Sequence, residues 1–224
     1  MSKKSLVLFV EGDGDCLAIP ILIKRLLTEY NAWDTIKLDP YPFKTGGVSK
    51  FFAIKNALKQ SNWERWLQAA CKRQNIGGVL VVIDGDASQF QGKTFCAADV
   101  ARELSARATR VGAGKFFSVA VVFAMQEYET WLMGGIQSLS GVKLPNNRSG
   151  VRSNAAIPQG DIESAPRDAK GWLSGQMETG ARAKRNSRRC KIWKSRGHST
   201  LIGLYNPNYI VALIRNKELP LNSY

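Results

Sequence analysis

Three short apolar runs stand out along the chain. Residues 5–10, 79–83 and 117–123 are almost continuously apolar and rich in β-branched side chains, as strands are when both faces of their sheet are covered. Each run is followed within a few residues by acidic side chains. The pattern predicts three central strands of a parallel sheet.

The segments between these runs space their apolar residues as helices do. In residues 15–27, Leu17, Ile19 and Leu26 recur at helical intervals, and Pro20 falls near the start, where a first turn accepts proline. Further predicted helices lie at 48–58, 63–72 and 94–110, and a short helix ends at residue 132. A short strand is predicted at 36–38, and glycine turns are predicted at 44–47 and 112–114. Strands that alternate with helices predict an α/β fold, with a mostly parallel sheet flanked by helices.

The composition changes after residue 140. Residues 1–140 hold 17 Lys/Arg against 13 Asp/Glu, whereas residues 141–224 hold 15 against 5. A chain of 224 residues is long for one domain and suits a domain plus an extension. We therefore expect an α/β domain at 1–140 and a basic, partly helical extension at 141–224, whose apolar residues 209–213 dock back on the same core.

The net charge of +14 favours a polyanionic partner, with nucleic acid ahead of an anionic membrane. Much of the excess positive charge lies in the basic tract at residues 182–196. This tract also contains Trp193, an aromatic side chain that could stack on a base. A solvated basic face is the alternative. The expected nucleic-acid contacts are Arg182, Lys184, Arg185, Arg188, Arg189, Lys191, Lys194 and Arg196.

Several classes of protein are disfavoured. No apolar stretch approaches the roughly 20 residues of a membrane span, and the N-terminus lacks the pattern of a signal peptide. The four cysteines are scattered and only one histidine is present, so neither a disulfide framework nor a zinc site is indicated. The phosphate-binding motif of NTPases is absent. We expect a cytoplasmic protein with reduced thiols.

Three acidic groups follow the three apolar runs. The carboxyl ends of parallel strands share one edge of a sheet, so these carboxylates should converge there, where their repulsion favours a bound cation. Oxygen ligands of this kind suit Mg²⁺ or Mn²⁺. Turn and cap residues are the alternative, and Asp15 is well placed to cap the next helix. The groups are Glu11 with Asp13 and Asp15, Asp84 with Asp86, and Glu127 with Glu129.

The motifs Glu11-Gly12 and Asp84-Gly85-Asp86 stand where the TOPRIM domain of topoisomerases, primases and OLD-type nucleases has its Glu-Gly and Asp-x-Asp hallmarks. Over residues 5–133, the chain also resembles an uncharacterised bacterial TOPRIM-like family associated with defence loci, through the runs at 10–15, 82–86 and 126–132. The resemblance implies a TOPRIM-like (Rossmann-like) sheet.

The resemblance also implies roles for the acidic residues. Glu11 would be the catalytic general acid or base, Asp84 and Asp86 would hold the metal, and Asp15 would complete a second metal site. Glu127 and Glu129 would add further ligands, although which of them faces the site is left open. The implied activity is Mg²⁺-dependent hydrolysis of phosphodiester bonds in DNA or RNA, by analogy beside an ABC-type ATPase partner.

Two other interpretations keep the same fold. One is a catalytically silent module that binds nucleic acid or a partner protein. The other is a receiver-like phosphoacceptor domain, which also gathers acids at strand ends. Against the second stand the Asp84 and Asp86 pair, where one acceptor would suffice, and the lack of a lysine directly after Phe123.

Overall fold

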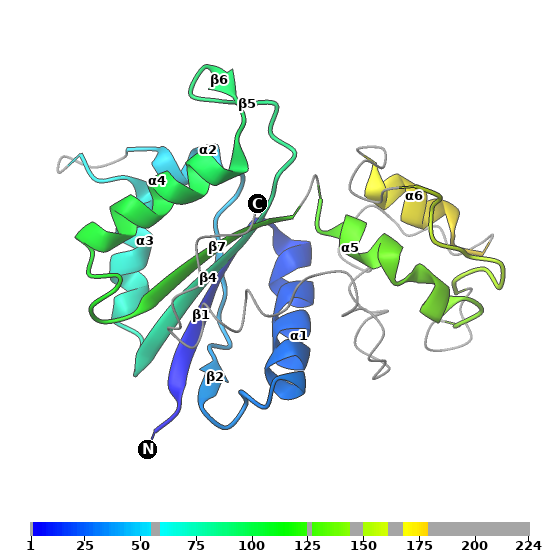
Figure 1. Cartoon of the computed structure of the whole chain (residues 1–224), viewed down its shortest axis with the longest axis horizontal. Helices are drawn as coiled ribbons and strands as arrows, with labels where there is room; N and C mark the ends of the chain where they lie inside the picture. Colours follow the sequence, from blue (N-terminus) through cyan, green and yellow to red (C-terminus); the bar gives the residue numbers. More distant parts are fainter. Residues whose placement is uncertain (1, 55–58, 125–126, 144–149, 161–167, 179–224) are drawn as a thin grey trace. The chain divides into compact units, whose positions relative to one another are not determined.

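The structure is a computed structural model that describes residues 2–54, 59–124, 127–143, 150–160 and 168–178 (Figure 1). Its internal contacts divide the chain into two compact units. Of the described residues, the first unit contains those up to 83 and residues 87–123, and the second contains residues 84–86 and those from 124 to 178.

The first unit is built on a five-stranded sheet with the order β2-β1-β4-β7, in which β3 also pairs with β1. Strand β1 runs parallel to β2, β3 and β4, with Leu8 opposite Leu80 in the centre. The mixed α/β class and the mostly parallel sheet predicted from the sequence are therefore confirmed. The strands are β1 (Lys4–Val10), β2 (Ile36–Leu38), β3 (Phe43–Lys44), β4 (Ile76–Asp84) and β7 (Ser118–Ala124).

Helices cover both faces of this sheet (Figure 1). Helix α1 (Asp13–Glu29) lies on one side, and α2 (Ser49–Phe52), α3 (Asn62–Cys71) and α4 (Ala97–Arg110) lie on the other. Phe9 and Val81 point from the sheet into the core beneath α3 and α4, where Trp63 is fully buried. The indole Nε1 of Trp63 donates to the Leu104 carbonyl at 2.8 Å, so the largest core side chain also has its polar atom satisfied.

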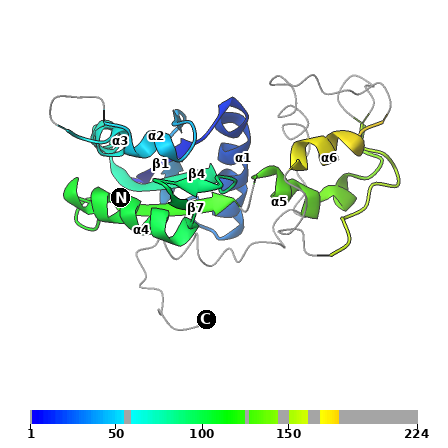
Figure 2. The ribbon, with the colours of Figure 1, turned by 90° about the horizontal axis from the view of Figure 1, so that it is seen from above.

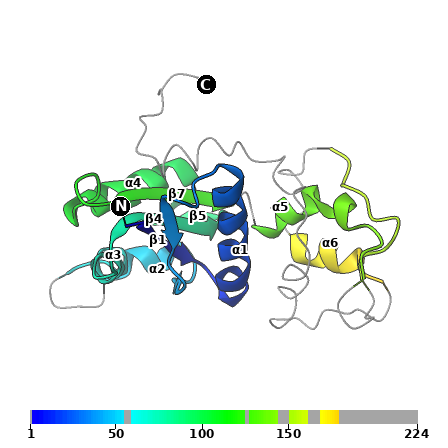
Figure 3. The same cartoon turned by 90° about the horizontal axis from the view of Figure 1, so that it is seen from below.

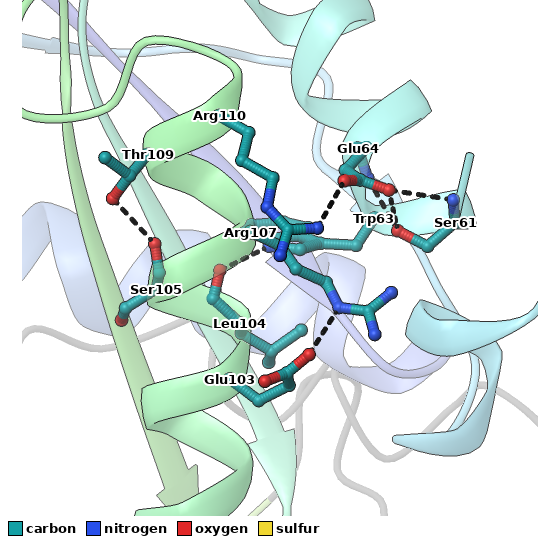
Figure 4. A network of polar contacts seen from close by, with 9 residues as sticks. All are labelled: Ser61, Trp63, Glu64, Glu103, Leu104, Ser105, Arg107, Thr109 and Arg110. Atoms are coloured by element: carbon teal, nitrogen blue, oxygen red, sulfur yellow. Dashed lines mark hydrogen bonds and ion pairs between the residues drawn. The ribbon is translucent and has the colours of Figure 1, made fainter. Parts of the chain in front are cut away.

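A polar network joins α3 to α4 at the surface of this core (Figure 4). The Ser61 backbone N–H donates to Glu64 Oε2 at 2.9 Å, and Arg110 lies 3.8 Å from Glu64 Oε1. Burial alone would raise the pKa of Glu64, but the hydrogen bonds from Ser61 and the charges of Arg107 and Arg110 outweigh it, and the pKa is lowered. Glu64 is therefore an N-terminal capping residue of α3 that also faces α4.

The second unit has a small core of its own. Helix α5 (Glu129–Gly134), the 3₁₀ helix η1 (Ile136–Leu139) and helix α6 (Ala169–Gly175) are its elements, and α5 and α6 lie side by side (Figure 2, Figure 3). The core consists of Ile136, Val151 and Ala155, against which Leu139, Trp172, Leu173 and Met177 pack.

Some predicted boundaries are wrong. The helix expected at 48–58 ends at Phe52, because Ala53 has an extended backbone and Ile54 forms a β-bridge with Ser61. The helix expected from residue 94 begins at Ala97, and β5 (Gln89–Phe90) and β6 (Lys93–Thr94) form a hairpin before it. Pro20 lies in the interior of α1, not in its first turn. The buried face of α1 compensates for the hydrogen bond that proline cannot donate.

Within the described ranges, no helix is both long enough and apolar enough to span a bilayer. Cys16, Cys71 and Cys96 are free thiols.

Candidate metal centre

The strand ends that carry the first two acidic groups share an edge of the sheet. Val10, the last residue of β1, lies opposite Val82 of the parallel strand β4. Glu11 follows Val10 directly, and Asp84 is the last residue of β4. Both residues therefore come at the carboxyl ends of neighbouring parallel strands, which is where open α/β sheets bind their ligands.

The backbone around Glu11 is held by the glycine turn at residues 44–47. The Thr45 N–H donates to the Val10 carbonyl and the Gly46 N–H donates to the Glu11 carbonyl, each at 2.9 Å. The buried Thr45 hydroxyl also donates to the Val10 carbonyl, at 3.0 Å. A Cβ atom at Gly47 would lie 3.6 Å from Glu11 Oε1, at ordinary van der Waals distance, so Gly47 is next to the carboxylate. The sequence predicted only a turn for this segment.

The two aspartates after Glu11 have separate contacts within the first unit. Asp13 Oδ1 lies 2.8 Å from Lys44 Nζ, and both side chains are exposed. Asp15 is buried, and its Oδ2 accepts the Gly12 N–H at 2.7 Å at the start of α1. Asp15 therefore has the capping contact considered from the sequence, and its expected role as a metal ligand stays a prediction.

The second unit brings together Asp84, Glu127 and Glu129, which we call the acid cluster. Asp84 Oδ1 accepts the backbone N–H of Tyr128 at 2.9 Å, which ties the end of β4 to the residue between the two glutamates. The Lys170 ammonium lies 3.4 Å from Glu129 Oε2 and 3.8 Å from Glu127 Oε1. Asp86, also expected as a ligand, is exposed.

Among the described residues, the acid cluster holds three carboxyl groups and one ammonium. Burial would lower the pKa of Lys170, but the charges of Glu129, Glu127 and Asp84 outweigh it, and the pKa is raised. Lys170 is therefore a charged ammonium that faces three carboxyl groups. Glu129 is only 5% exposed, and Glu127 Oε2 is buried with no hydrogen-bond partner among the described residues.

These donors suit a hard divalent cation, because they are carboxylate oxygens and one of them is buried without a hydrogen bond. Their arrangement nevertheless differs from that of a formed metal site. In the part of the chain that the structure describes, no group of three or more Asp, Glu, His or Cys side chains has the spacing of such a site. Lys170 lies beside both glutamates, and its positive charge there would oppose the binding of a metal cation to them.

Lys170 was missed from the sequence, where it counted only as one of many basic residues after position 140. Nothing in its local sequence distinguishes it, and only its contacts reveal it. The predicted nucleic-acid contacts lie outside the described residues, and they are Arg182, Lys184, Arg185, Arg188, Arg189, Lys191, Lys194 and Arg196.

Comparison with known proteins supplies a family. No curated protein matches the sequence. The family model described as "Domain of unknown function (DUF4276)" matches residues 10–169. The matched span includes Glu11 and the whole acid cluster and ends one residue before Lys170. Because it covers more than half of the chain, the protein belongs to the DUF4276 family.

Proposed function

We propose that this protein is a metal-dependent nuclease that hydrolyses phosphodiester bonds in DNA or RNA. The observation that carries the proposal is the acid cluster, in which three carboxyl groups at and near the end of a central parallel strand face one ammonium among the described residues, that of Lys170. Such an excess of buried negative charge is costly unless a cation balances it. The strong positive charge of residues 141–224 supports a polyanionic substrate.

The proposal gives each residue a task. Asp84, Glu127 and Glu129, with the exposed Asp86, would hold Mg²⁺ or Mn²⁺. When bound, the metal supplies Lewis-acid stabilisation and an activated water for in-line displacement at phosphorus.

Glu11 would hold or transfer a proton at its carboxylate, as general acid or base. The 44–47 turn supports this role, because its backbone N–H groups donate to the carbonyls of Val10 and Glu11 and so hold the backbone at this point.

The basic residues at 182–196 would hold the polymer through its phosphates, and their charge would not participate in bond cleavage. We also propose an ABC-type ATPase partner in a bacterial defence system. The support for this partner is the resemblance to TOPRIM nucleases that work beside such ATPases, together with the lack of a phosphate-binding NTPase motif in this sequence.

The test is cleavage of single- and double-stranded DNA and RNA by the purified chain, with Mg²⁺, with Mn²⁺ or with EDTA. We expect cleavage only with a divalent cation. Glu11→Gln should lower the rate at saturating substrate by about 10²–10⁴-fold, the usual cost of losing general acid–base catalysis. Glu29→Gln is the matched control, because Glu29 is an exposed glutamate at the far end of α1.

Cleavage that persists in EDTA, or at full rate in Glu11→Gln, would contradict the proposal. Salt-dependent binding of nucleic acid without cleavage, with or without an ATPase, would favour the silent-module interpretation.

A further inference from the structure

Lys170 lies beside carboxylate oxygens that a metal ligated by Glu127 and Glu129 would use. Its ammonium lies 3.8 Å and 3.4 Å from one oxygen of each glutamate, whereas Mg²⁺ must approach such oxygens to about 2.0–2.1 Å. An ammonium and a divalent cation that share these oxygens would be separated by only a few ångströms. Their repulsion means that one cation weakens the binding of the other.

The Lys170 side chain can leave the acid cluster without disturbing its helix. The side chain is 45% exposed, whereas those of Glu127 and Glu129 are 15% and 7% exposed, so the lysine already borders water. The helix backbone is held by other contacts. Asp168 Oδ1 accepts the Gly171 N–H at 2.7 Å, and Trp172 and Leu173 pack in the small core.

We propose that Lys170 is a built-in competitor for the divalent cation, which neutralises part of the acid cluster in the metal-free protein and moves into solvent when the cation binds. Lys170 would then set the cation concentration at which the site loads. The inference rests on the proposed function, because it assumes that the acid cluster binds a metal. It adds a residue that lies beyond the matched family span and that opposes metal loading.

The test is calorimetric titration of Mn²⁺ into the full-length chain and its variants. Lys170→Met keeps an unbranched side chain but removes the charge, and should bind Mn²⁺ on the order of 30-fold more tightly, as expected for removing a unit charge about 4 Å from a divalent cation in water. Lys170→Arg should stay near the wild-type affinity. Lys143→Met, which removes an exposed lysine from the same unit, should leave the affinity unchanged.

Thermal unfolding gives a second readout that does not depend on activity. In EDTA, Lys170→Met should unfold at a lower temperature than the wild type, because the acid cluster loses its counter-ion, and Mn²⁺ should raise that temperature by more than in the wild type. Unchanged or weaker Mn²⁺ affinity in Lys170→Met, with normal binding to the wild type, would overturn this inference alone. Failure of both proteins to bind Mn²⁺ would overturn the proposed metal site and this inference with it.

Discussion

Asp84 accepts a hydrogen bond and also adds negative charge to the acid cluster. Two substitutions distinguish these two roles. Asp84 Oδ1 accepts the N–H of Tyr128, a residue only 9% exposed, at 2.9 Å. Asp84→Asn keeps an oxygen acceptor in the same place, so the stability should change little. Asp84→Ala leaves the Tyr128 N–H without this acceptor, which costs about 1–3 kcal/mol. For a chain of this length that loss lowers the unfolding temperature by about 2–12 °C.

Both variants should weaken cation binding, because both remove the charge, and Asp84→Ala also removes the oxygen ligand. A unit negative charge about 4 Å from a divalent cation contributes about 2 kcal/mol even at the dielectric constant of water, which corresponds to about 30-fold in affinity. Thermal unfolding in EDTA and calorimetric titration of Mn²⁺ measure the two effects separately. If Asp84→Asn destabilises the protein as much as Asp84→Ala, or if Asp84→Asn binds Mn²⁺ as tightly as the wild type, the reasoning is refuted.

Two further predictions concern charge elsewhere in the chain. The lowered pKa of Glu64 means that its contribution to stability is present above the ordinary value of 4.5 and is lost as pH falls below it. The difference in unfolding temperature between the wild type and Glu64→Gln should therefore be larger at pH 7 than at pH values below 4.5, and a constant difference would contradict this. Replacing Arg185, Arg188 and Arg189 with glutamine should weaken nucleic-acid binding and reduce its salt dependence by up to about 0.9 log unit per lost phosphate contact. An unaltered salt slope would assign the tract to a solvated surface.

The central strands were predictable because their sequence signal is local. A strand covered on both faces needs an apolar side chain at nearly every position, and residues 5–10 and 79–83 meet that condition. The ends of elements were less predictable. The strand was expected at 79–83, yet β4 also includes Gly77 and Gly78 before it, and Gly77 lies against the Lys4 side chain with no room for a Cβ atom.

The candidate site was predictable only as far as chain topology fixes it. Glu11 and Asp84 follow neighbouring parallel strands, and the alternating elements of the sequence indicated that the strands run parallel. The hydrogen bond from Tyr128 to Asp84 and the approach of Lys170 to the glutamates depend on how distant segments pack. No local pattern encodes such contacts, so the sequence predicted ligands but not the lysine beside them.

The most direct test of the central claim is anomalous diffraction from crystals of the full-length protein soaked in Mn²⁺. The account predicts an anomalous peak at the acid cluster, with oxygens of Asp84, Glu127 or Glu129 at metal-binding distance and the Lys170 ammonium withdrawn towards solvent. A peak elsewhere, or a fully soaked crystal in which Lys170 keeps its contacts of 3.4 Å and 3.8 Å and no Mn²⁺ lies beside the carboxylates, would contradict it.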